Sequence, residues 1–260
     1  RASGPTPPPA PPPATPGSSF YIYDLAANPL LNDSHPTGAA RYEAPGAAYV
    51  HDAHVVAYAG DAGHAYAGQT IAYACLGDAL GVFNVTDMRA PHPLDRVVYP
   101  GLAYAHQVWT RWPHAYLNDE HLAEDGKAVR TTVFVFDVSD LRNVTLVARF
   151  SNGIGAATHN LFVRGSLIFQ ANYASGARVY DVSEPLHPRE VASFDTHPEN
   201  DGGDFVGLWG VYPFFPSGTV VGSDITRGLF VWRLQSEPPD DRANALAQVQ
   251  PWPWLVVGVA

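Results

Sequence analysis

The sequence predicts an all-β fold, a β-propeller, and two observations carry this prediction. The first is an internal repeat with steps of 44 to 55 residues, which is the period of propeller blades that contain several short strands each. The second is the character of the candidate strands. They are rich in Val, Phe, Ile and Tyr, are separated by glycine-bearing turns and show no 3.6-residue apolar stripe, which argues against helical repeats of similar length.

The repeat is clearest at the two ends of each unit. Units begin 55, 53 and 50 residues apart, at His51-Asp52, His106-Gln107, His159-Asn160 and Trp209-Gly210. The first three units end on matching runs, Phe83–Asp87, Phe136–Asp140 and Tyr180–Glu184, and the fourth ends at Gly228–Trp232 without an Asp-x-Ser tail. The chain therefore contains four full units.

The expected strands follow in order along the chain, at 20–25, 133–138, 161–163, 167–170, 178–182, 219–221 and 229–234. Consecutive apolar residues, as in "VFVFDV", favour sheets covered on both faces by neighbouring sheets. Glycine-bearing turns at 164–166 and 174–176 reverse the chain between antiparallel strands. Four full units and the partial one in "FYIYDLAANPLLN" predict about five blades. The ring closes if the strand at 20–25 joins the last sheet; otherwise the chain is an open piece of a larger ring.

Composition divides the chain into three parts. Residues 1–19 are proline-rich and predict an extended linker without a fold. Residues 20–236 form the propeller domain, and residues 237–260 are a C-terminal tail. The closing "PWPWLVVGVA" is apolar but shorter than the ~18 residues that a spanning helix needs. We therefore expect no membrane insertion within this chain, and an anchor would lie outside it.

The net charge limits the classes of binding partner, and the cysteine content limits the disulfide bonds. A net charge of −10 and a pI near 5.4 argue against binding to nucleic acid or to an anionic membrane. Cys75 is the only cysteine, so no disulfide framework is possible within the chain and a buried structural thiol is expected.

Three Asn-x-Ser/Thr sequons begin at Asn32, Asn84 and Asn143. Asn143 lies in an expected loop between blades and is the best candidate for a glycan. Asn84 occupies the position that Asp137 and Asp181 fill in other units, which favours a local hydrogen-bonding role. Together with the proline-rich linker, the sequons predict an extracellular or cell-surface glycoprotein.

Several long phrases carry a resemblance to a known family. "AHQVWTRWPHAYLNDE", "THNLFVRGSLIFQANYASGARVYDVSEP" and "EVASFDTHPENDGGDFVGLWGVYPFFPSGTVVGSDITRGLFV" are similar to the core of the choice-of-anchor B family. The resemblance covers about residues 19–234 and implies a secreted or surface-anchored propeller of LVIVD-type repeats. Family members usually carry further repeats on the N-terminal side. The resemblance implies no particular biochemical activity.

The repeated histidines allow two interpretations. His51, His106 and His159 recur at equivalent positions, and with Asp119 and Glu120 nearby they predict a site for a divalent metal ion. A repeated polar residue is also what a structural role predicts, in which each blade is tied to the next through backbone hydrogen bonds. No HExxH or Cys-x-x-Cys motif decides between them.

We therefore expect a non-enzymatic interaction module that presents loops on a rigid ring to a protein or glycan ligand. The alternative is a metal-dependent hydrolase in which His51, His106 and His159, with Asp119 or Glu120, activate a water molecule against esters or phosphates.

Overall fold

The computed structural model describes residues 19–24, 40–43, 49–60, 63–120, 131–202, 204–235 and 254–258. All regular elements in these ranges are β-strands, which confirms the all-β prediction. The described residues form no helix long and apolar enough to cross a membrane.

The strands of the described residues form five antiparallel sheets. Three sheets have four strands each: β3 (Asp52–Ala57), β4 (Thr70–Cys75), β5 (Leu80–Asn84) and β6 (His92–Val97); β7 (Ala105–Arg111), β8 (His114–Asp119), β9 (Thr132–Asp137) and β10 (Thr145–Ser151); β11 (Leu161–Arg164), β12 (Leu167–Ala171), β13 (Ala177–Asp181) and β14 (Arg189–Phe194). A three-stranded sheet follows, with β15 (Leu208–Tyr212), β16 (Thr219–Asp224) and β17 (Gly228–Arg233). The fifth sheet places β1 (Ser19–Asp24) between β2 (Ala40–Glu43) and β18 (Trp254–Gly258).

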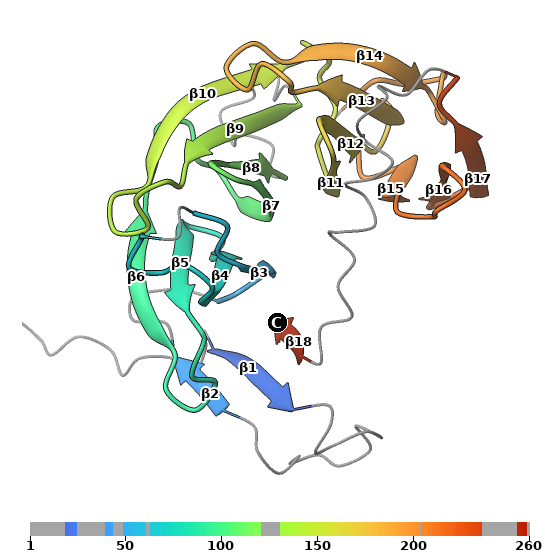
Figure 1. Cartoon of the computed structure of the whole chain (residues 1–260). Helices are drawn as coiled ribbons and strands as arrows, with labels where there is room; N and C mark the ends of the chain where they lie inside the picture. Colours follow the sequence, from blue (N-terminus) through green and yellow to red (C-terminus); the bar gives the residue numbers. More distant parts are fainter. Residues whose placement is uncertain are drawn as a thin grey trace, which may run out of the picture.

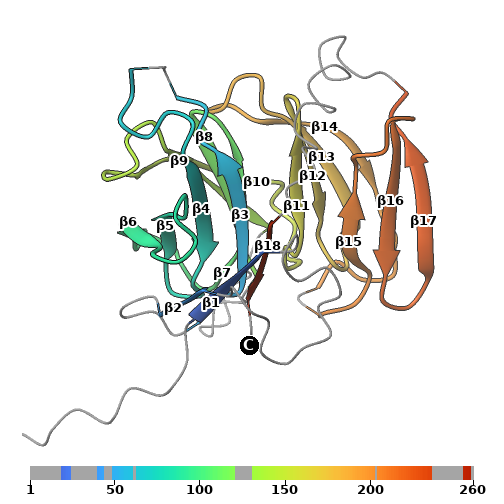
Figure 2. The same cartoon turned by 60° about the horizontal axis from the view of Figure 1, so that its bottom comes forward.

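The sheets follow one another in chain order along an arc, and this arrangement fits a β-propeller (Figure 1). The first strand of each repeat, β3, β7, β11 and β15, lies toward the centre, whereas β6, β10 and β14 lie at the outside. Figure 2 shows the same sheets from a second direction, with neighbouring sheets side by side. Each sequence repeat is therefore one radial sheet, as predicted.

The condition set for a closed ring, that the strand at 20–25 joins the last sheet, is not met among the described residues. The expected strand at 20–25 appears as β1, but β1 pairs with β18 and β2 and not with the β15–β17 sheet. The sequence analysis had placed residues 254–258 in a tail, yet this apolar run gives β1 an antiparallel partner along five positions, from Phe20 opposite Gly258 to Asp24 opposite Trp254. Backbone pairing along that ladder satisfies groups that a lone edge strand leaves open.

The core consists of apolar layers between successive sheets. Leu80 and Val82 of β5 belong to one layer with Phe134 and Phe136 of β9. Alternate residues of the same strand face the opposite layer, where Val135 meets Ile168 of β12. Both faces of β9 are thus covered, and this explains the uninterrupted apolar run that the sequence shows there.

The Asp-x-Ser tails of the repeat close turns after the third strand of a sheet. Asp137 Oδ1 accepts a hydrogen bond from the Ser139 backbone N–H at 2.8 Å, and Asp181 does the same for Ser183 at 2.9 Å. Asn84 plays this part for Thr86 at 3.0 Å and also donates from Nδ2 to Gln69. The local role expected for Asn84 is confirmed.

Two other sequence features can be placed. Asn143 is exposed in the loop between β9 and β10, whereas Asn32 lies outside the described residues. Cys75 is a free, fully buried thiol, as expected.

Candidate metal centre

The three repeated histidines form a column at the centre of the arc. They lie at or next to the starts of β3, β7 and β11. Each inner strand therefore places a histidine at the same end of its sheet. Ring centroids are 4.2 Å apart between His51 and His106 and 4.5 Å apart between His106 and His159. Trp209, the fourth member of the series, stacks on His159 at 4.9 Å.

Two of the histidines tie their own sheet to the next one. His51 Nδ1 lies 3.0 Å from the backbone carbonyl oxygen of His106, and His159 Nδ1 lies 2.5 Å from that of Trp209. A carbonyl can only accept, so Nδ1 is a protonated nitrogen in both rings, and in the neutral form of each ring Nε2 carries the lone pair. This is the tautomer that a histidine uses when Nε2 binds a metal and Nδ1–H is held by the backbone.

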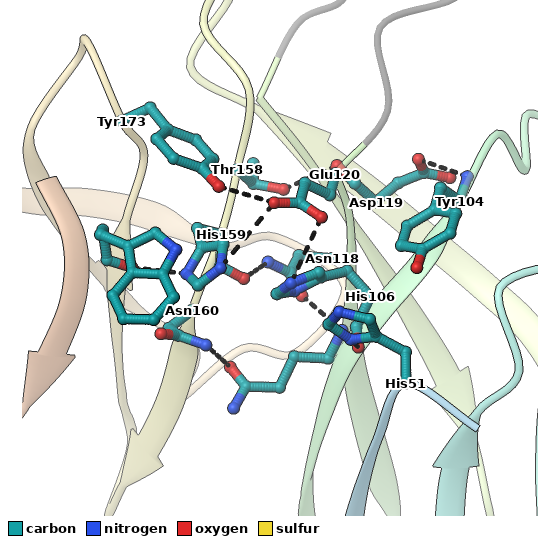
Figure 3. A network of polar contacts seen from close by, with 12 residues as sticks. His51, Tyr104, His106, Asn118, Asp119, Glu120, Thr158, His159, Asn160 and Tyr173 are labelled. Carbon is teal, nitrogen blue, oxygen red and sulfur yellow. Dashed lines mark hydrogen bonds and ion pairs between the residues drawn. The ribbon is translucent and has the colours of Figure 1, made fainter. Parts of the chain in front are cut away.

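Glu120, the residue directly after β8, faces this column (Figure 3). Its Oε2 is 3.4 Å from His106 Nε2, and its Oε1 is 3.8 Å from His159 Nε2. The Tyr173 hydroxyl donates a hydrogen bond of 2.7 Å to Oε1. The carboxylate therefore has one oxygen bound by a phenol and the other directed at His106.

His106 is the unusual member of the group. Its side chain is 1% exposed. Neither ring nitrogen meets strict hydrogen-bond geometry in the described structure, but the His159 backbone acts as a hydrogen-bond partner that raises the pKa of His106 against the effect of burial. Burial, followed by the neighbouring His159 and His51 rings, lowers the pKa of His106 to about 2. Burial also lowers the pKa of His159, against the opposite influence of Glu120. Both imidazoles are therefore neutral at pH 7, and neutral imidazole is the form that binds metals.

Ligand-type atoms of His51, His106 and Glu120 lie within 4.8 Å of one another. Two imidazoles and a carboxylate are a suitable donor set for zinc and similar divalent ions. His106 is buried within this group, and its Nε2 lies 3.4 Å from the Glu120 carboxylate. The group could therefore hold a divalent metal ion.

Polar side chains between the β7–β10 and β11–β14 sheets hold the column in place. Asn118 accepts from the Gln107 backbone N–H at 3.1 Å and donates to the carbonyl oxygen of His159. Gln107 accepts from the Leu161 backbone N–H at 2.6 Å, and Thr158 donates to the carbonyl oxygen of Asp119 at 2.7 Å. These contacts fix the backbone on both sides of the histidines.

The structure does not bring all five predicted ligands together. The Asp119 carboxylate points away from the column (Figure 3) and accepts the backbone N–H groups of Ala103 and Tyr104 at 2.7 Å each. His159 lies beside the group through its contact with Glu120 but is not part of it. Asp119 thus anchors the loop before β7, while its neighbour Glu120 turns toward the centre.

The sequence analysis missed Tyr173, although the repeat contains a signal for it. Glu120 and Tyr173 are 53 residues apart, the same step that separates His106 from His159. They therefore fill the same position of successive repeats, directly after or near the end of the second strand. A comparison of that position across the units would have singled out both residues.

Comparisons with known proteins add structures of limited similarity. No family model and no curated protein matches the chain, so the resemblance to the choice-of-anchor B family stays a prediction. The computationally designed Ika4 protein is 13% identical, with a TM-score of 0.44 over 63% of this chain and 85% of that one. The periplasmic gluconolactonase PpgL of Pseudomonas aeruginosa is 16% identical, with a TM-score of 0.49 over 76% of this chain. A putative 6-phosphogluconolactonase of Bacteroides fragilis is 12% identical, with a TM-score of 0.34 over 82% of this chain and 68% of that one.

This chain spans 53% of the gluconolactonase.

The expectation of a non-enzymatic interaction module is corrected by the geometry of the site. The centre of the arc holds a group of side chains suited to a metal ion. A purely structural reading of the repeated histidines overlooks that one ring nitrogen can tie two sheets together while the other faces the centre. This group fits the metal-dependent alternative better than a non-enzymatic module.

Proposed function

We propose that the protein binds a divalent metal ion through His51, His106 and Glu120 and hydrolyses carboxylic esters, including cyclic ones. The observation that carries the proposal is the His51, His106 and Glu120 group itself, whose ligand-type atoms lie within 4.8 Å of one another around a buried imidazole. A divalent ion bound there would polarise an ester carbonyl and make a bound water acidic.

The chain's own residues account for the remaining steps. His51 and His159 are held by backbone carbonyls with Nε2 unprotonated. His159 lies next to the three ligands, where it would take a proton from the attacking water. The water oxygen bonds to the carbonyl carbon, the bond from that carbon to the alkoxy oxygen breaks, and the alkoxy oxygen receives the proton from His159.

Esters fit this surrounding better than phosphates. The rings around the column are Tyr49, Tyr104, Tyr173 and Trp209. Neither lysine nor arginine is among the described residues that form the histidine column and the rings around it. These two residue types are the usual partners of phosphate groups. A neutral substrate needs no such partner.

The test is metal analysis by inductively coupled plasma mass spectrometry on protein purified without a histidine tag or chelator. We expect close to one divalent ion per chain in the wild type, and its loss in Glu120→Gln and His106→Ala. The matched control is His187→Ala, which removes an exposed histidine in the loop between β13 and β14. A panel of aryl, alkyl and cyclic esters, with chelation and re-addition of the metal, then tests hydrolysis. Equal metal content in all four proteins, or none in the wild type, contradicts the proposal.

Three further expectations from the sequence remain proposals. The sheets would be the five blades of a ring, closed or part of a larger one. The chain would belong to the choice-of-anchor B family, and it would act outside the cell or at its surface. The exposed position of Asn143 supports the last of these, and a glycosidase-sensitive mass shift of the natural protein would test it.

A further inference from the structure

Tyr173 has a backbone conformation that its side chain disfavours. Its φ is 42°, and it is the only non-glycine residue with a positive φ in the described part of the chain. For a bulky aromatic residue such a φ is a genuine outlier, because Cβ approaches the following carbonyl oxygen. Strained conformations of this kind persist where the surroundings determine them, and they cluster at functional sites.

The surroundings of Tyr173 do determine it. Its N–H donates to the Leu208 carbonyl and its own carbonyl accepts from the Leu208 N–H, both at 2.9 Å. The carbonyl also accepts from the Gly176 N–H at 3.0 Å. Gly207 allows this close approach, because a Cβ there would stand 2.4 Å from the Tyr173 carbonyl oxygen. The β12–β13 turn and the start of β15 thus clamp one residue.

The clamp delivers the phenol to Glu120. The hydroxyl donates a hydrogen bond of 2.7 Å to Oε1, and the ring lies edge-on to the His159 ring with centroids 5.2 Å apart. With Oε1 occupied, Oε2 is the oxygen that faces His106.

We infer that Tyr173 is a positioning residue that fixes Glu120 as a one-oxygen metal ligand, by holding Oε1 so that Oε2 is left to face His106. The inference rests on the metal site of the proposed function and deepens it. Outer partners that hold a ligand in this way typically change metal affinity by about 10- to 100-fold. Tyr173 acts through Glu120 and touches neither the ion nor the substrate.

The experiment measures Zn²⁺ affinity by competition with a chromophoric chelator, without any substrate. We expect Tyr173→Phe to weaken Zn²⁺ binding about 10- to 100-fold. The matched control is Tyr116→Phe, which removes a fully buried hydroxyl that makes no hydrogen bond in the described structure, and it should bind Zn²⁺ like the wild type. Gly207→Ala displaces Tyr173 with its phenol intact and should also weaken binding, which keeps the inference testable if Tyr173→Phe folds poorly.

A double-variant cycle separates positioning from a general loss of structure. If Tyr173 acts through the carboxylate, Tyr173→Phe should have less than a twofold effect on the residual Zn²⁺ affinity in a Glu120→Ala background, which has no group for the phenol to hold. Unchanged affinity in Tyr173→Phe, in a wild type that does bind Zn²⁺, overturns this inference and leaves the proposed metal site intact. A full effect in the Glu120→Ala background overturns it too. A wild type that binds no Zn²⁺ overturns both.

Discussion

Asp119 and Glu120 are neighbours in sequence, and we expect the first to anchor a loop and the second to bind the metal ion. Substituting each residue in turn distinguishes these two roles. The Asp119 carboxylate, 7% exposed, accepts two backbone N–H groups at 2.7 Å each. A hydrogen bond to a charged group contributes about 1.5–3 kcal/mol. Asp119→Asn keeps one acceptor and should lower the free energy of unfolding by about 1.5–3 kcal/mol, whereas Asp119→Ala loses both bonds and should lower it by about 3–6 kcal/mol.

Urea unfolding followed by tryptophan fluorescence measures these losses, and metal analysis of the same preparations measures the other role. Asp119→Asn should keep its metal and lose stability. Glu120→Gln should lose its metal and keep the stability of the metal-free wild type, since the amide oxygen can still accept from Tyr173. The reasoning is refuted if Asp119→Asn loses the metal at unchanged stability, because Asp119 would then be a ligand and not a loop anchor.

Three other outcomes are expected. Stability should fall in acid, because hydrogen bonds from Ser139 and Ser183 outweigh burial and lower the pKa of Asp137 and Asp181 below 3.8; that contribution is present above about pH 4 and is lost as pH drops through the lower folded values. In a double Asp137→Asn, Asp181→Asn variant, the urea midpoint of unfolding should change less between pH 5 and pH 3 than it does in the wild type. Cys75, whose pKa burial raises, should react with a disulfide reagent only as fast as the protein unfolds, and rapid reaction of the native protein would contradict its burial. His54→Ala removes a ring stacked on Trp109 at 3.9 Å and should cost about 1–3 kcal/mol in urea with no change in metal content.

The radial sheets could be predicted because each repeat has the same physical task. A blade is buried on both faces, so its strands need consecutive apolar residues, and it must reverse three times, so it needs turn residues at fixed intervals. Strands β9, β11, β12, β13 and β17 appear within one or two residues of their expected positions. The pairing of β1 with β18 could not be predicted in this way, because β18 comes from residues 254–258, outside the repeat.

The site could be predicted only in part, because the sequence does not show which way a side chain points at the end of a strand. Asp119 ends β8 and Glu120 follows it, and both are carboxylates next to the same histidines. Which one faces the centre depends on the N–H groups of Ala103 and Tyr104, which capture Asp119. Tyr173 was hidden for a different reason, since its role depends on a left-handed backbone that only the contact with β15 imposes.

The two interpretations of the repeated histidines are compatible once the ring nitrogens are considered separately. The tie between blades uses Nδ1, as the contacts of His51 and His159 with the next carbonyl show. The same bond fixes the tautomer that leaves Nε2 available, which is the requirement for a ligand. A propeller that fastens its inner strands with histidine therefore builds a row of oriented Nε2 lone pairs at its axis. One carboxylate added at a neighbouring position of one repeat, here Glu120, is enough to turn that row into a candidate metal site.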